Sequence, residues 1–181
     1  MSLPAIKSGP RERPMTRVQL LNMLLTIIVM MMGTLRSHAQ TLTVSLSANS
    51  VNFNLIAGST NNPGSTSITA TTVCSCVFQN VNVYAYFNSA AAALTNAGNN
   101  IPSSAFQISA NGGAFQPLVN TEVFGGANAG VRISNFFTLF PGFGSTHNDT
   151  MAFNIDLSGG TLPSLPPGTY SGTLNIRAQA P

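Results

Sequence analysis

The fold class is decided by the stretch Asn80–Phe87, which reads Asn-Val-Asn-Val-Tyr-Ala-Tyr-Phe. In an extended chain its apolar residues share one face: Val81, Val83, Ala85 and Phe87. Its polar and tyrosine residues share the other face with the next residue along the chain: Asn82, Tyr84, Tyr86 and Asn88. This alternation of β-branched and aromatic residues predicts a strand in the middle of a sheet, with a neighbour on each side.

Shorter runs after residue 40 repeat the pattern. Strands are predicted at Thr41–Ser47, Val51–Leu55, Ser65–Val73, Val131–Leu139, Thr150–Leu157 and Thr169–Ala178. Asn111-Gly112-Gly113 lies between two further runs, 106–110 and 114–118, and predicts a tight hairpin turn. The alanine run Ala90–Leu94 is compatible with one helical turn. Eight or nine short strands without a periodic helix predict an all-β, antiparallel immunoglobulin-like β-sandwich, with a small barrel as the alternative.

The last predicted strand adds a resemblance. Residues 167–176 read Pro-Gly-Thr-Tyr-Ser-Gly-Thr-Leu-Asn-Ile. This stretch resembles the final strand of bacterial exported immunoglobulin-like proteins, namely pilus subunits and spore-coat-U-like proteins. The resemblance implies a sandwich fold and a place in an extracellular assembly. The chain departs from pilus subunits in lacking a pair of distant cysteines for a disulfide between strands.

The N-terminal segment has the pattern of an export signal. An apolar run, Leu20–Met32, follows several basic residues and precedes the small-residue site Ser37-His38-Ala39. We predict that residues 1–39 are a signal peptide, with Met15 as a possible start, and that residues 40–181 form one β-sandwich domain. The run is shorter than the roughly 20 residues that span a bilayer. We therefore expect no stable membrane span after cleavage and a secreted, periplasmic or cell-surface protein.

The charge of the predicted mature chain excludes one class of partner. Five of the seven Lys and Arg residues lie in the leader, which leaves Arg132 and Arg177 against Glu122, Asp149 and Asp156. Two arginines do not make the basic surface that nucleic-acid binding needs, so we expect no nucleic-acid partner. A surface kept polar by Ser, Thr and Asn offers little electrostatic resistance to association, which suits an assembled protein.

Cys74 and Cys76 are the only cysteines, and an exported chain meets an oxidising compartment. In a flat strand their side chains would share a face about 6.6 Å apart, whereas a disulfide needs Cβ atoms about 3.5 to 4.5 Å apart. A bond between them therefore requires a turn or bulge at Ser75. Three states remain open: this disulfide, free thiols, and a link to another chain. A metal site is not expected, because zinc usually takes four ligands.

Catalytic chemistry has few candidates. His147 is the only histidine after residue 39 and stands beside Asp149, as an acid–base pair or as part of a turn that opens the next strand. No nucleophile elbow or phosphate-binding glycine loop is present, and only three carboxylates follow the leader. We expect no catalytic residue, cofactor or metal, and keep an enzyme centred on His147 as the least favoured hypothesis.

Two surfaces are candidate binding sites. Leu42, Val44 and Leu46 make an alternating strand at the mature N-terminus that can add to a neighbour's sheet or to its own. Tyr84 and Tyr86 share one strand face and would form a sugar platform if exposed, as would the loop aromatics Phe140 and Phe143. The leading hypothesis is an exported, non-enzymatic structural or adhesive protein of the bacterial cell surface or an extracellular assembly. The alternative is a secreted carbohydrate-binding module, so the expected partners are protein subunits or surface glycans.

Overall fold

A computed structural model describes residues 41–139, 145–159 and 165–180 of the chain. The predicted leader, residues 1–39, and the loop aromatics Phe140 and Phe143 lie outside the described residues. Among the residues described, no helix is both long and apolar enough to cross a bilayer.

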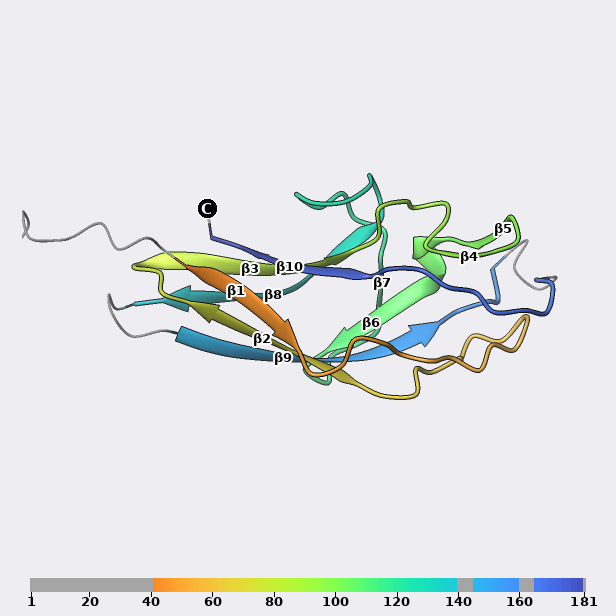
Figure 1. Cartoon of the computed structure of the whole chain (residues 1–181), viewed down its shortest axis with the longest axis horizontal. Coiled ribbons are helices and arrows are strands. Elements are labelled where there is room, and N and C mark those ends of the chain that lie inside the picture. The colour runs from red at the N-terminus through yellow and green to blue at the C-terminus, as the bar shows by residue number, and fades with distance from the viewer. Residues whose placement is uncertain (1–40, 140–144, 160–164, 181) are drawn as a thin grey trace, which may run out of the picture. The chain divides into compact units, whose positions relative to one another are not determined.

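The described residues fold into two antiparallel sheets that pack face to face (Figure 1). The five-stranded sheet contains, in spatial order, β1 (Leu42–Leu46), β2 (Ile68–Cys74), β9 (Ser145–Ile155), β6 (Phe106–Ala110) and β7 (Gln116–Pro117). The three-stranded sheet contains β10 (Asn175–Gln179), β3 (Gln79–Tyr86) and β8 (Gly130–Thr138). A small hairpin of β4 (Leu94–Asn96) and β5 (Asn99–Ile101) precedes one 3₁₀ turn, Ser103–Ala105. The predicted all-β antiparallel sandwich is confirmed.

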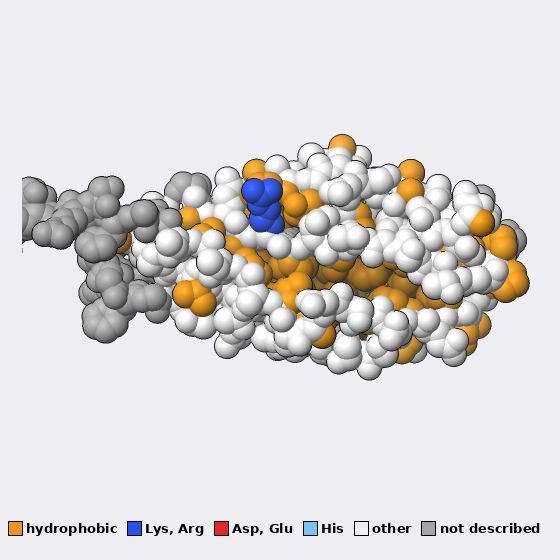
Figure 2. Space-filling model, in the orientation of Figure 1, with side chains coloured by type: hydrophobic (Ala, Val, Ile, Leu, Met, Phe, Trp, Pro, Cys, Tyr) orange, Lys and Arg blue, Asp and Glu red, His pale blue; other side chains and the backbone are white. Residues whose placement is uncertain are grey.

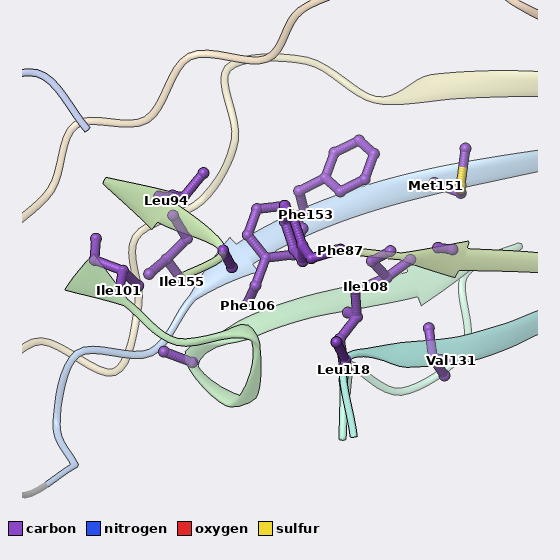
Figure 3. Packing of buried hydrophobic residues seen from close by; sticks show 14 of the residues in the cluster. Phe87, Leu94, Ile101, Phe106, Ile108, Leu118, Val131, Met151, Phe153 and Ile155 are labelled. Atoms are coloured by element: carbon purple, nitrogen blue, oxygen red, sulfur yellow. The ribbon is translucent and has the colours of Figure 1, made fainter. Parts of the chain in front are cut away.

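The stretch that decided the fold class forms β3, which pairs with β10 on one side and β8 on the other. Val81, Val83 and Ala85 are fully buried, and Phe87 is nearly so, as the alternation predicts. The core gathers around Phe106, whose ring lies 5.1 Å from that of Phe87 in an edge-to-face arrangement. Figure 3 shows this pair beside Phe153 on β9. Aromatic pairs of this kind join the two sheets.

The predicted hairpin at Asn111-Gly112 is present between β6 and β7. Asn111 has a φ of 52° and Gly112 a φ of 76°. Two successive positive φ angles are what a type I′ turn requires, and Asn-Gly tolerates them best. The strand Thr41–Ser47 is also confirmed, as β1.

Two predicted elements are wrong, and a third is shorter than predicted. Val51–Leu55 is not a strand, because its backbone contacts a neighbour only through the bridge of Phe53 to Gly64 and the bonds between Asn52 and Ser65. Ala90–Leu94 is not helical: the Ala93 N–H donates 2.9 Å to the Ile101 carbonyl, and Leu94 begins β4. The final strand begins only at Asn175, since residues 169–174 pair with no strand except through the bridge of Ser171 to Thr95.

The strand predicted at Thr150–Leu157 begins earlier than expected, and the possible turn at His147 and Asp149 is not present. β9 begins at Ser145 and pairs with β2 along its first seven residues, with His147 opposite Thr72 and Asp149 opposite Ala70. His147 and Asp149 are therefore strand residues and not turn formers. Hydrogen bonding to a long neighbouring strand outweighed the turn preference of the Asn-Asp pair.

Candidate functional site

The two sheets leave one side of the sandwich open. β1 has β2 as its only partner strand among the described residues, and β10 has only β3. These two edge strands approach each other. Beyond them, the segments 46–57 and 165–176 run along the two sides of the opening without pairing to one another. The open side is thus bounded by two chain segments that share no backbone hydrogen bond with each other among the described residues.

An apolar groove occupies this opening. One part has a volume of about 380 Å³ and lies between segment 46–53 and segment 169–176, over a floor that includes Phe87, Phe106 and Met151. A second part of about 400 Å³ continues between segments 51–57 and 165–170. Figure 2 shows the floor as a long apolar strip between two polar rims. These three floor residues are at most 4% exposed, so the apolar surface that solvent reaches comes from half-buried side chains such as Phe53 and Ile176.

Both rims expose groups that a strand would cover. Val51, Phe53, Leu174 and Ile176 pack against the core cluster but stay only partly buried. On the second rim, the N–H groups of residues 172–174 donate no hydrogen bond to any described residue. Unpaired N–H and C=O groups beside apolar side chains are the features that an added strand satisfies.

The first rim is held in place by a buried amide. Asn62 is fully buried, and its Oδ1 accepts the Ile56 N–H at 2.6 Å. Its Nδ2 donates to the carbonyls of Ile155 at 2.8 Å and Ser59 at 3.1 Å. These bonds tie the loop after the rim to the end of β9, so the groove is preformed rather than dependent on a ligand.

The predicted strand-addition segment is β1, and the structure pairs it with β2 of the same chain. Leu42 and Val44 are half-buried on the inner face, and Leu46 is 38% exposed beside the groove. β1 is therefore an edge strand whose inward side chains are only partly buried against the core. Its residues lie next to the opening but do not fill it.

Cys74 and Cys76 are joined by a disulfide, with Ser75 at the turn between them. Both cysteines are buried with Val81 in a small apolar cluster at one end of the sandwich. Ser75 holds the start of β1: its N–H donates 3.0 Å to the Thr41 carbonyl, and its Oγ accepts the Thr41 N–H at 3.1 Å. The disulfide turn thus fixes the end of β1 next to β2.

Tyr84 and Tyr86 lie on the outer face of β3 but are only 7% and 8% exposed. Phe124, from the loop before β8, covers them, with ring centroids 6.0 Å from Tyr84 and 6.1 Å from Tyr86. Gly125 fits there because a Cβ at this position would collide with the Tyr86 ring. The two rings are covered and do not present the open platform that sugar stacking requires.

His147 and Asp149 do come together, with Nε2 and Oδ1 3.2 Å apart. Asp149 is fully buried and also accepts the Ser134 hydroxyl at 2.6 Å and the Asn111 Nδ2 at 2.8 Å. The His147 ring stacks on Phe136 with centroids 4.4 Å apart. Sequence reasoning missed Ser134 and Asn111, which come from a different strand and a turn.

The Asp149 cluster has the geometry of a structural bridge. Ser134 on β8 belongs to the three-stranded sheet, and Asp149 on β9 to the five-stranded sheet, so their bond crosses the sandwich. The serine donates to the carboxylate and not to the histidine, which differs from the order of a nucleophile activated by a base. Within the described residues, no three His, Cys, Asp or Glu side chains are grouped to hold a metal.

Asp156, just after β9, has a pKa below its ordinary value. The Ser158 hydroxyl donates to its Oδ1 at 2.6 Å and the Ser158 N–H at 2.9 Å, and both bonds stabilise the ionised form. Burial acts weakly in the opposite direction. This local turn is separate from the Asp149 cluster.

The sequence matches no protein-family model and no curated protein.

Proposed function

We propose that the chain is an exported, non-enzymatic structural subunit that assembles with further copies of itself by strand addition at the groove. The observation that carries this proposal is the groove between segments 46–57 and 165–176. An apolar slot with unpaired backbone on both sides suits an extended strand better than a small molecule, because a strand supplies hydrogen bonds along its whole length.

The strand order supports the same occupant. In an immunoglobulin sandwich, strands A, B, E and D form one sheet, and C, F and G form the other. Here β1, β2, β9 and β6 correspond to A, B, E and D, while β3 and β10 take the places of C and F. No described strand takes the place of G, beside β10 and opposite β1. The groove begins at the ends of β1 and β10, at Leu46 and Ile176, and continues beyond them on the side where that strand would pair.

The favoured donor is the segment Thr41–Ser47 of a second copy. Seven extended residues span about 23 Å, and each rim of the main groove section is eight residues long by number, 46–53 and 169–176. Leu42, Val44 and Leu46 would place three apolar side chains on the groove floor. Within their own chain these residues are only partly buried. Insertion of the segment into the groove of a second copy, between two rims, would increase their burial.

The test is assembly of the mature chain, residues 40–181, followed by light scattering after size-exclusion chromatography. We expect oligomers that Val44→Asp abolishes, because Val44 faces inward, whereas Thr43→Asp on the exposed face of the same strand leaves them intact. Val51→Asp places a charge in the groove and also abolishes self-assembly. Mixing the Val44→Asp and Val51→Asp variants should restore a complex that stops at two chains, since one variant keeps its strand and the other its groove.

A strictly monomeric wild-type chain over the whole concentration range would refute the proposal. Equal loss of assembly in Thr43→Asp and Val44→Asp would refute the strand as donor, because it would show no dependence on the inward face. Circular dichroism of each variant checks that the sandwich is intact.

A further inference from the structure

The outer face of the three-stranded sheet carries two ordered polar rows. In the register of β10, β3 and β8, Arg177 lies beside Tyr84, and Tyr84 lies beside Arg132. Two residues along β10 and β3, and three along β8, a second row places three amides side by side: Gln179, Asn82 and Asn135. Each row is about 10 Å wide across three strands, and the rows are about 6.6 Å apart. The face lies on the side of this sheet away from the core, and Phe124 covers Tyr84 in the middle of the first row.

A β-bulge puts Arg132 in its row. The register shifts between Val83 and Tyr84, so that Ser134 opposes Val83 while Arg132 opposes Tyr84, and Ile133 is the extra residue. If the register did not shift and Ile133 paired with Tyr84, Arg132 would oppose Ala85, whose side chain is fully buried in the core. Bulges re-aim side chains in this way, often at functional sites. Here the bulge brings the arginine to the outer face.

The two arginines are the only Lys or Arg residues in the described part of the chain. Neither lies within 4.0 Å of a described carboxylate, and the carboxylate on this side, Glu122, packs against Gly130 instead. Two cations without ion-pair partners therefore sit across one strand from each other. They form the one concentration of positive charge on the described surface.

Arg177 is held in place. Its guanidinium carbon lies 4.2 Å from the centroid of the Phe124 ring, and Phe124 is itself packed against Tyr84 and Tyr86. A cation over an aromatic ring is stabilised by the ring quadrupole. A side chain already ordered in this way loses less conformational entropy when it binds an anion.

The amide row adds hydrogen-bonding groups without charge. Asn135 Nδ2 donates 2.8 Å to Asn82 Oδ1, which leaves the Asn82 Nδ2 and the Asn135 Oδ1 free of described side-chain partners. Such groups bind hydroxyls, which both donate and accept. Guanidinium groups bind carboxylates in a fixed fork geometry.

We propose that this face binds an acidic polysaccharide, with sugar carboxylates on Arg132 and Arg177 and sugar hydroxyls on the amide row. A face three strands wide that carries two cations and a row of amides suits an elongated polymer, whereas a small anion would need a concave site. The site differs from the tyrosine platform predicted from the sequence. Tyr84 and Tyr86 lie under Phe124 and are not exposed, so they pack beneath the charged side chains and do not contact the sugar.

The test is binding of the mature chain, residues 40–181, to polygalacturonate, measured by affinity electrophoresis and titration calorimetry. Dextran serves as a neutral polysaccharide and polyglutamate as an acidic polymer that is not a sugar. We expect binding to polygalacturonate that weakens between 50 and 300 mM salt through screening, and no binding to dextran. Arg132→Gln and Arg177→Gln should each weaken binding about threefold, and the double variant about tenfold.

Thr71→Gln, on the outer face of the five-stranded sheet, is the matched control and should bind like the wild type. Asn135→Ala should weaken binding to polygalacturonate, as the amide row requires. The proposal is overturned if the double arginine variant binds unchanged, if dextran binds as well as polygalacturonate, or if polyglutamate binds equally.

This inference does not depend on assembly. A chain that is monomeric but binds polygalacturonate through the arginines supports the glycan site and refutes the proposed self-assembly. A chain that assembles but does not bind polygalacturonate supports the proposed self-assembly and refutes the glycan site.

Discussion

Replacing Asp149 by alanine tests whether the bond network across the sandwich is structural. The substitution removes a fully buried carboxylate that accepts from Ser134, Asn111 and His147. Ser134 is the partner that belongs to the other sheet. Asp149→Ala therefore breaks a link between the two layers and leaves donors without an acceptor.

The size of the effect follows from these bonds. Hydrogen bonds to a charged group contribute about 1.5 to 3 kcal/mol each. Two short bonds, from Ser134 and Asn111, would together give about 3 to 6 kcal/mol. Removing the carboxylate also removes the cost of burying its charge, which offsets part of the loss. We expect Asp149→Ala to lower the free energy of unfolding by about 3 kcal/mol.

The assay is urea unfolding of residues 40–181 followed by far-UV circular dichroism, because the chain has no tryptophan. With a slope of about 2 kcal/mol per molar urea, the midpoint should fall by about 1.5 M. Asp156→Ala is the control, since among the described residues that carboxylate bonds only to Ser158, within its own turn. A loss below about 0.5 kcal/mol for Asp149→Ala, or equal losses for both variants, would refute the bridge.

Two further predictions concern the loop over β3 and the turn after β9. Gly125→Ala should lower the free energy of unfolding by about 2 kcal/mol, because Gly125 has a φ of 88° and an added Cβ meets the Tyr86 ring; Gly159→Ala, with nothing within 4 Å of its added Cβ, should be neutral in the same urea assay. Ser158→Ala should raise the pKa of Asp156 toward its ordinary value, measured by NMR titration. A carboxyl with a lowered pKa in the folded state adds stability above its unfolded pKa of about 3.9, and this stability is lost as the pH falls through the folded pKa. Wild type and Ser158→Ala should therefore differ in stability above about pH 4 and converge in stronger acid; a constant difference at every pH would contradict this assignment.

Sequence patterns predicted the elements that depend least on which other strands pair with them. The alternation in Asn80–Phe87 gave a central strand with the correct buried face, and Asn111-Gly112 gave the correct hairpin. Both signals are local: side chains alternate along any strand, and a type I′ turn needs particular residues at two positions. Val51–Leu55 has the same alternation, and its apolar side chains are half-buried, yet it is not a strand. It lines an open groove because no neighbouring strand lies beside it.

The candidate sites depended on distant residues and could be foreseen only in part. His147 and Asp149 were singled out because they are adjacent in sequence, but the bonds that define their role come from Ser134 and Asn111. The tyrosine face was correctly placed on one side of β3. Phe124, which covers this face, lies about forty residues further along the chain, and no local pattern predicts its contact with Tyr84.

By itself the sequence determined an all-β chain with one central strand, a tight hairpin and few charged groups, because these depend on residue type and on spacing along the backbone. Tertiary structure alone decided that a groove stays open between two rims, that Asp149 bridges the sheets, and that a bulge turns Arg132 outward beside Tyr84. Each of these features depends on which strands become neighbours and in which register, and a single strand's alternation is the same whatever strand pairs with it.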